Sequence, residues 1–171
     1  MDFSLSKTEQ LYLQMLRSFA QNEVKPLAAE VDEQERFPQE SIAKLGKIGA
    51  FGIPFPKEYG GAGGTNVMYS MAVEEISRVC AATGVVVSAH TSLCVNPIFE
   101  FGTEEQRMKY LPKLCAGEWI GAFGLTEPNA GTDAAAQQTT AVLEGDHYIL
   151  NGNKIFITNA EYAHVYIIFA M

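Results

Sequence analysis

The spacing of apolar residues changes abruptly at Trp119, and this change limits the folds that the chain can adopt. Before Trp119, apolar residues recur every three or four positions, which is the spacing of one helix face. After it, short apolar runs are separated by turn sequences such as Glu144-Gly145-Asp146 and Asn151-Gly152-Asn153. The sequence therefore predicts an all-α helical domain at residues 1–118, followed at 119–171 by the start of an antiparallel β domain.

Five helical segments are predicted before Trp119, and local sequence marks where some of them begin. The stretches Ser6–Glu9 and Thr103–Gln106 have the pattern of capping boxes, in which two side chains close the first turn. Pro26 is expected to kink the first helix without ending it, because the apolar spacing continues beyond the proline. Residues 52–64 are rich in Gly and Pro, which predicts a loop. The helical segments are Ser6–Val31, Pro38–Ile48, Met68–Val79, Gly84–Phe101 and Thr103–Gly117.

The segment Gly84–Phe101 is apolar on nearly every side, which predicts a helix that is buried among others. His90 within it is expected to be a core side chain with satisfied hydrogen bonds rather than a catalytic group. Cys94 and Cys115 are expected to pack in the same way, as small apolar residues.

The β segment is predicted to contain five short strands. The last strand runs to the end of the chain at Met171, which leaves an apolar edge without a partner. We therefore expect the chain to be truncated, or to be completed by another polypeptide. The predicted strands are Trp119–Leu125, Gln138–Leu143, His147–Leu150, Lys154–Thr158 and Val165–Phe169.

Charge and composition exclude several classes of protein. The 12 Lys and Arg against 20 Asp and Glu give a net charge of −8, which disfavours binding to nucleic acid. The sequence has no run of 18 apolar residues and no basic N-terminal start, so we expect neither a membrane span nor a signal peptide. The three cysteines and three histidines lack the spacing of a disulfide framework or a metal site, so no metal is expected. These features predict a cytoplasmic globular protein.

The loop from Phe123 to Asp133 carries the densest functional signal. It leaves a predicted strand and enters a polar stretch in which Gly131 permits close backbone approach and Thr126 and Thr132 offer hydroxyl groups. Such a loop suits a flat polar cofactor that needs several backbone N–H donors. An ordinary surface loop has the same composition, so these residues alone leave both interpretations open.

A second candidate segment is Lys154–Asn159. If it is a strand, its period of two places Phe156 and Thr158 on one face, where an aromatic ring and a hydroxyl can contact one planar ligand. The alternative is a core phenylalanine beside an edge threonine.

Taken together, five stretches resemble the N-terminal part of an acyl-CoA dehydrogenase, in family order and across essentially the whole chain. The sequence around Ser88–Phe101 is most similar to bacterial short-chain, butyryl-CoA-type members. The matching stretches are Lys57–Gly61, Ala72–Glu75, Phe101–Gln106, Leu125–Pro128 with Ala130–Asp133, and Asn151–Lys154 with Ile157–Asn159.

The resemblance implies a helical N-terminal domain, a β middle domain and a helical C-terminal domain, in a homotetramer. It also implies non-covalent FAD, oxidation of an acyl-CoA to its trans-2-enoyl form, and electron transfer to an electron-transferring flavoprotein. The family's catalytic glutamate would lie beyond Met171, so no catalytic residue is expected in this chain and the isolated chain is expected to be inactive. Glu127 is expected to bond the turn or the backbone rather than abstract a proton.

The same resemblance assigns binding residues. Thr132 matches a position that contacts the acyl-CoA, and Cys94 and Val95 border the acyl pocket in the family. Phe123 and Phe156 stand where Tyr and Trp are commoner, so each keeps a stacking surface and loses a polar group. The flavin-contacting positions are matched by Phe123, Leu125, Thr126, Gly131, Thr132, Phe156, Ile157 and Thr158.

Two other functions remain open at this point. A non-catalytic helical interaction module, completed by a partner chain or by self-association, would explain the unpaired strand at Val165–Phe169; stoichiometric FAD binding would count against it. The same fold could also carry the chemistry of an acyl-CoA oxidase or a flavin monooxygenase, which oxygen consumption by the complete protein would distinguish.

Overall fold

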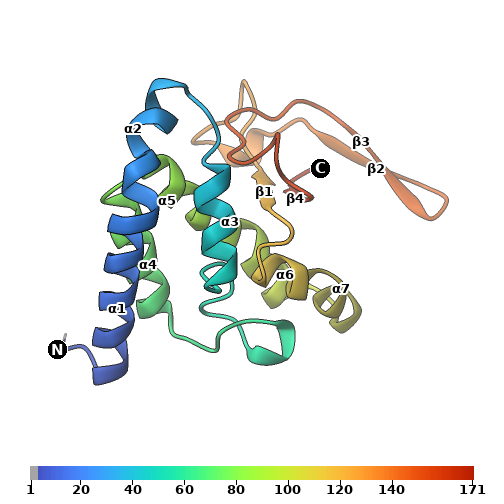
Figure 1. Ribbon diagram of the computed structural model, residues 1–171. Helices are drawn as coiled ribbons and strands as arrows, with labels where there is room; N and C mark the ends of the chain where they lie inside the picture. The colour runs from blue at the N-terminus through green and yellow to red at the C-terminus, as the bar shows by residue number, and fades with distance from the viewer. Residues whose placement is uncertain (1–3) are drawn as a thin grey trace.

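The computed structural model describes residues 4–171, with helices forming the body and the β segments at one end (Figure 1). The chain enters the β segments only after its last long helix, α7, as the change of spacing at Trp119 predicts. The helical elements are α1 (Lys7–Phe19), η1 (Ala20–Val24), α2 (Lys25–Glu33), α3 (Gln39–Lys47), η2 (Lys57–Tyr59), α4 (Asn66–Ser77), α5 (Ala81–Ser88), η3 (Ala89–Val95), α6 (Asn96–Phe101), α7 (Glu104–Cys115) and η4 (Ala134–Ala136).

Both predicted capping boxes are confirmed. The Ser6 hydroxyl accepts from the Glu9 backbone N–H at 3.3 Å, and the Glu9 carboxylate accepts from the Ser6 N–H at 2.8 Å. At α7, the Thr103 hydroxyl and the Gln106 side chain make the equivalent pair of bonds. Each box satisfies donors that the first turn of a helix leaves without an intrahelical acceptor.

Two long helices each contain a π-helical segment just before a proline. The first runs through α1, η1 and α2, and its winding changes at Ala20–Val24, one turn before the kink predicted at Pro26. The second runs through α5, η3 and α6, with the π segment Ala89–Val95 ending two residues before Pro97. Because a proline ring clashes with the preceding turn and removes a donor, a widened turn accommodates it.

The helical stretch Ala81–Phe101 is the core of the helical body, as its apolar composition predicts. Its approach to α4 is so close that a Cβ built on Gly84 would lie 1.9 Å from the Ser77 Oγ. The stretch has 21 residues and is long and apolar enough to cross a membrane by length and composition alone. More than half of it is buried inside the protein, including His90, so it is accounted for as a core helix.

Among residues 4–171, three clusters of buried side chains hold the helices together, and the second also reaches β4 (Val165–Ile168). Cys80, Cys94 and Cys115 are free and buried. Burial raises the pKa of Cys94 to about 11 and that of Cys115 to about 12, so both thiols stay protonated and pack as predicted. The first cluster includes Leu16, Leu45, Phe51, Ile53, Ile76 and Val87, and the second includes Phe55, Cys94, Val95, Leu111, Leu114 and Cys115.

The β segments form two separate pairs. Strands β2 (Thr140–Glu144) and β3 (His147–Asn151) make an antiparallel hairpin that projects from the helical body (Figure 1). Strand β1 (Gly121–Gly124) instead pairs in parallel with β4, in the register Gly121↔Val165. The antiparallel prediction therefore holds for the hairpin, whereas the pair next to the helices runs parallel.

The strand predicted at Lys154–Thr158 is wrong. The segment contains no strand: the backbone bends at Phe156, which has φ 57°, and turns from Thr158, with φ 71° at Asn159. Positive φ values are incompatible with an extended strand. The alternation of Phe156 and Thr158 that suggested a strand thus belongs to a bent segment, whose two ends are held by contacts from distant parts of the chain.

Candidate functional site

A pocket of about 230 Å³ lies where β1, the π segment η3 and the bent segment meet. Six of the eight residues predicted to bind a cofactor line it, although they come from two stretches about 30 residues apart. The pocket is smaller than the roughly 300–1,000 Å³ of a typical small-molecule site. The lining residues are Ala89, Leu93, Phe123, Leu125, Thr126, Phe156, Ile157 and Thr158.

Each wall of the pocket follows from local structure. Phe123 belongs to β1, and Leu125 and Thr126 continue from its end, so the strand aims them at one place. Ala89 and Leu93 come from η3, and their spacing of four places both on one face of that helix. The bent segment supplies the third wall.

Gly131 and Thr132 do not line this pocket. They are exposed, beyond the short bridge in which Glu127 and Ala130 exchange backbone hydrogen bonds of 3.0 and 3.1 Å. A Cβ built on Gly131 would meet nothing within 4 Å, so contacts within this chain do not require a glycine there. Both residues face solvent and are therefore accessible to a ligand or to another chain.

Cys94 and Val95 do not line this pocket either, and their assignment to an acyl pocket stays a prediction. Both are 0% exposed. Cys94 lies beneath β1, where a Cβ built on Gly121 would be 2.4 Å from its Sγ. Sequence reasoning missed Ala89 and Leu93, which line the pocket from the same helix. Their spacing of four was the available signal, since each residue along a helix is turned by about 100° from the last.

The bent segment presents Phe156 in an unusual way. Its side chain is 87% exposed, and its backbone has φ 57°, in the left-handed region that costs a non-glycine residue about 1 kcal/mol. Backbone strain of this kind concentrates at functional sites, where surrounding contacts hold it in place. An exposed ring on a strained backbone at a pocket rim is suited to stacking on a planar ligand.

We expect Phe156→Gly to be more stable than Phe156→Ala, which reverses the usual order of these two residues. Glycine adopts φ 57° without steric cost, whereas alanine keeps the strain and restores no burial. The expected difference in the free energy of unfolding is about 1 kcal/mol, measured by urea denaturation. Equal stability, or a more stable alanine variant, would show that Phe156 is not strained.

Two threonine hydroxyls complete the lining. Within residues 4–171, neither Thr126 Oγ1 nor Thr158 Oγ1 has a hydrogen-bond partner from another residue. Hydroxyl groups at a mostly apolar pocket can donate to or accept from a polar ligand edge. Aromatic surfaces together with these hydroxyls match the chemistry of a planar heterocycle with a polar rim.

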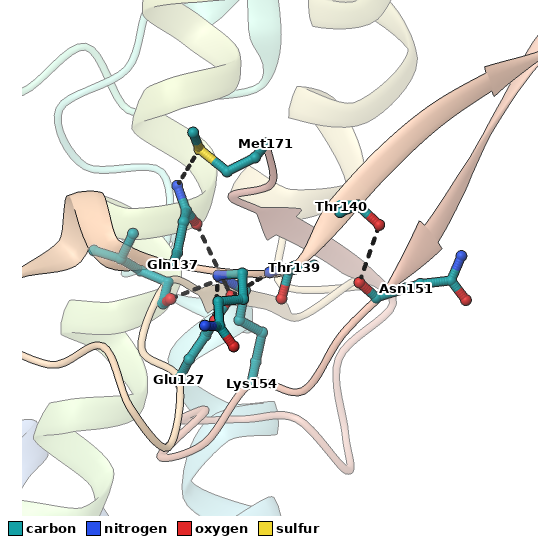
Figure 2. Close-up of polar contacts among 9 residues, drawn as sticks. Glu127, Gln137, Thr139, Thr140, Asn151, Lys154 and Met171 are labelled. Carbon is teal, nitrogen blue, oxygen red and sulfur yellow. Dashed lines mark hydrogen bonds and ion pairs between the residues drawn. The ribbon is translucent and has the colours of Figure 1, made fainter.

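A buried ion pair ties the bent segment to the loop that follows β1 (Figure 2). The Lys154 Nζ donates to the Leu125 carbonyl at 2.9 Å, to Glu127 Oε1 at 2.8 Å and to Gln137 Oε1 at 3.1 Å. The next residue, Ile155, donates its N–H to the Thr126 carbonyl at 2.9 Å. All three ammonium protons are used, so Lys154 holds two walls of the pocket together.

Glu127 is fully engaged in this network. Besides Lys154, it accepts from the backbone N–H groups of Gln138 at 2.6 Å and Thr139 at 2.9 Å. The hydrogen bond from Lys154, followed by those from Thr139 and Gln138, lowers the pKa of Glu127 to about 2. A carboxylate this acidic and this constrained is a poor base, and the prediction that Glu127 bonds the backbone is confirmed.

His90 is satisfied inside the core, as predicted. Its Nδ1 accepts from the Gly121 N–H at 3.0 Å, and its Nε2 lies 3.1 Å from the Leu114 carbonyl and therefore carries the proton. Burial lowers the pKa of His90 to about 4, so the ring is neutral at neutral pH. Among residues 4–171, no group of three or more His, Cys, Asp or Glu side chains is arranged to hold a metal ion.

Two protein-family models together match almost the whole chain. Residues 6–118 match the family model for the acyl-CoA dehydrogenase N-terminal domain, and residues 122–171 match that for the acyl-CoA dehydrogenase middle domain. The chain is 64% identical over 171 residues to the acyl-CoA dehydrogenase, short-chain specific, of Clostridium acetobutylicum, and the match covers 100% of this chain and 45% of that relative.

Two solved structures share the fold. One is a chain from a structure described as the electron transferring flavoprotein of Acidaminococcus fermentans, with 52% identity, a TM-score of 0.97 and coverage of 100% of this chain and 45% of that one. The other is a glutaryl-CoA dehydrogenase from Mycobacterium smegmatis in complex with FADH2, with 35% identity, a TM-score of 0.93 and coverage of 98% and 43%. The chain thus spans less than half the length of these relatives.

Proposed function

Because the chain belongs to the acyl-CoA dehydrogenase family, we propose that it supplies the helical domain and one wall of the flavin site of an FAD-dependent short-chain acyl-CoA dehydrogenase. The reaction is oxidation of a short-chain acyl-CoA to trans-2-enoyl-CoA. The observation that carries the proposal is the convergence of six residues, from two distant stretches, on one pocket. The two family models also support a division into domains at residues 1–118 and 119–171.

The residues of the pocket fit a flavin. Phe156 and Phe123 offer aromatic surfaces, and the hydroxyls of Thr126 and Thr158 offer hydrogen bonds to a polar ring edge. When bound, FAD supplies the two-electron oxidation of the acyl chain. The exposed loop at Gly131 and Thr132 is placed to contact the parts of the cofactor or the acyl-CoA that extend beyond the pocket.

The pocket wall formed by Ala89 and Leu93 suits the acyl chain of the substrate. Ala89 and Leu93 are apolar and border the flavin-facing residues, so they exclude water from an acyl chain lying against the pocket. No carboxylate lines this pocket, and Glu127 is held by Lys154. The base that removes the α-proton is therefore proposed to come from outside these 171 residues, and the chain alone is expected to be inactive.

The proposal extends to partners and location. An electron-transferring flavoprotein is the proposed electron acceptor, and a homotetramer is the proposed assembly. Three buried free cysteines support a reducing compartment, which we take to be the cytoplasm.

The first test is an FAD titration followed by quenching of flavin fluorescence, with saturable one-to-one binding as the expected result. It is performed on the 171-residue chain and on the same chain joined to the C-terminal part of the Clostridium acetobutylicum relative. The double variant Thr126→Val with Thr158→Val should bind FAD roughly 10- to 100-fold more weakly, because each hydroxyl provides about 1 kcal/mol of hydrogen bonding.

The control is Thr8→Val on the exposed face of α1, which should bind like the unchanged protein. Failure of both proteins to bind FAD would contradict the proposal. Self-association without flavin would then favour the helical interaction module instead.

A further inference from the structure

The bent segment from Lys154 to Asn159 is held at both ends. At its beginning, Lys154 is tied to Leu125 and Glu127. At its end, the Asn159 Nδ2 donates to the Gly121 carbonyl at 3.0 Å and lies 3.5 Å from the Val86 carbonyl. The strained Phe156 lies between these two attachments. A backbone in such a costly conformation persists only where surrounding contacts hold it, and the attachments at Lys154 and Asn159 are such contacts.

Gly121, whose carbonyl accepts from Asn159, is itself fixed by buried contacts. Its N–H donates to His90 Nδ1, and the other ring nitrogen of His90 donates to the Leu114 carbonyl, so the imidazole links α7 to the start of β1. No side chain fits at this position, because a Cβ would lie 2.4 Å from Cys94 Sγ. The strand can therefore move neither toward nor along the helix without breaking buried contacts.

The chemistry at the end of the segment requires an amide nitrogen. Asn159 is 8% exposed, and both groups that its Nδ2 faces are backbone carbonyls. Its Oδ1 is buried and has no hydrogen-bond partner among residues 4–171. Rotating the amide, or replacing it with a carboxylate, would aim an oxygen at the Gly121 carbonyl, which repels it. The left-handed backbone of Asn159, φ 71°, is one that asparagine tolerates better than most residues.

We propose that Asn159 is the positioning residue of the flavin pocket. It acts through Ile157 and Thr158, which it fixes relative to β1, so that the Thr158 hydroxyl and the Thr126 hydroxyl keep one spacing across the pocket. Asn159 does not line the pocket itself. The inference rests on the proposed flavin site, and it adds that Asn159 orders this site before a ligand binds.

The test uses two substitutions at Asn159 that separate its side chain from its backbone. Asn159→Gly keeps the left-handed conformation and removes the amide, whereas Asn159→Asp keeps the shape and removes the donor. The matched controls are Asn153→Gly and Asn153→Asp, at an exposed asparagine of the same turn region. All are made in the FAD-binding protein of the titration described above.

For Asn159→Gly we expect roughly tenfold weaker FAD binding, because the segment without its attachment would hold the binding arrangement in only about a tenth of the molecules, and a larger loss for Asn159→Asp. At saturating FAD, the visible absorption bands and the midpoint potential of the bound flavin should shift in both variants. The Asn153 variants should match the unchanged protein in all three measurements.

Hydrogen exchange gives a measurement that needs no flavin. The N–H of Ala160 donates to the Ile157 carbonyl and that of Tyr162 to the Asn159 carbonyl, at 3.2 and 2.9 Å. In Asn159→Gly these two amides should exchange at least about tenfold faster, while amides in α1 and α4 keep their rates.

Three results would overturn the inference. These are unchanged affinity, spectrum and exchange in Asn159→Gly; exchange that accelerates everywhere, which would make Asn159 a general stability residue; and equal effects at Asn153. If the unchanged protein does not bind FAD at all, the proposed function fails, whereas the exchange comparison still decides whether Asn159 orders the segment.

Discussion

Glu127→Ala is expected to lower the melting temperature by on the order of 10 °C, the largest loss we expect from a single substitution. The change leaves the Lys154 ammonium and the N–H groups of Gln138 and Thr139 without their carboxylate acceptor. Lys154 itself is 10% exposed in its side chain, so its charge becomes buried and unpaired. Differential scanning calorimetry or circular dichroism measures the shift.

The control for this prediction is Glu144→Ala at the end of β2, where the side chain is exposed and should shift the melting temperature by less than about 1 °C. The double variant Glu127→Leu with Lys154→Met should lose less than the sum of the two single substitutions, because it removes both charges. A shift of under 3 °C in Glu127→Ala would mean that the ion pair contributes little to holding the pocket walls.

The second large effect is a loss of stability in mild acid caused by His90. The pKa of this histidine is lowered in the folded state, from 6.5 to about 4, because the core disfavours the charged ring. Between these values the unfolded chain binds a proton and the folded chain does not, so stability falls as the pH decreases from about 6.5 to 4. Above 6.5 this contribution to the pH dependence is absent.

The expected loss over this window is about 3 kcal/mol, measured by urea unfolding at a series of pH values. His90→Gln should remove the slope between pH 6.5 and 4, whereas His147→Asn on the exposed hairpin should keep it. The lowered pKa of Glu127, about 2, adds a separate loss only below about pH 4.5. A flat profile from pH 6.5 to 4 in the unchanged protein would contradict the neutral, buried state of His90.

Features set by neighbouring residues were predictable from the sequence. Capping boxes at Ser6 and Thr103 locate two helix starts because their bonds span only three residues. The hairpin follows from turn residues between two apolar runs. The residues that the family resemblance assigned to a flavin at Phe123–Thr126 and Phe156–Thr158 include six that the fold brings together in one pocket.

Features set by distant contacts were not predictable in this way. The bend at Phe156 depends on Lys154 reaching Glu127 and on Asn159 reaching Gly121, 38 positions away in the sequence. Alternating residue types cannot reveal that both ends of a segment are tied down. The parallel pairing of β1 with β4 also joins residues that are distant in the sequence, such as Gly121 and Val165. The sequence pattern identified the helix without fixing its rotation, so it could not show that Ala89 and Leu93 line this pocket.

The π segment Ala89–Val95 lines the pocket with one set of residues and contacts β1 with another. Ala89 and Leu93 face the pocket, while the residue after each, His90 and Cys94, faces the first residue of β1. A wider turn brings residues four apart closer to alignment than the 3.6-residue turn of an α-helix does. Deleting one residue from this segment would restore ordinary helical winding. One residue of the pair Ala89 and Leu93 would then turn away from the pocket, and one of the pair His90 and Cys94 would turn away from β1. A one-residue insertion or deletion in this segment is therefore expected to disturb the pocket lining and the contacts to β1 together, whereas a substitution alters one contact at a time.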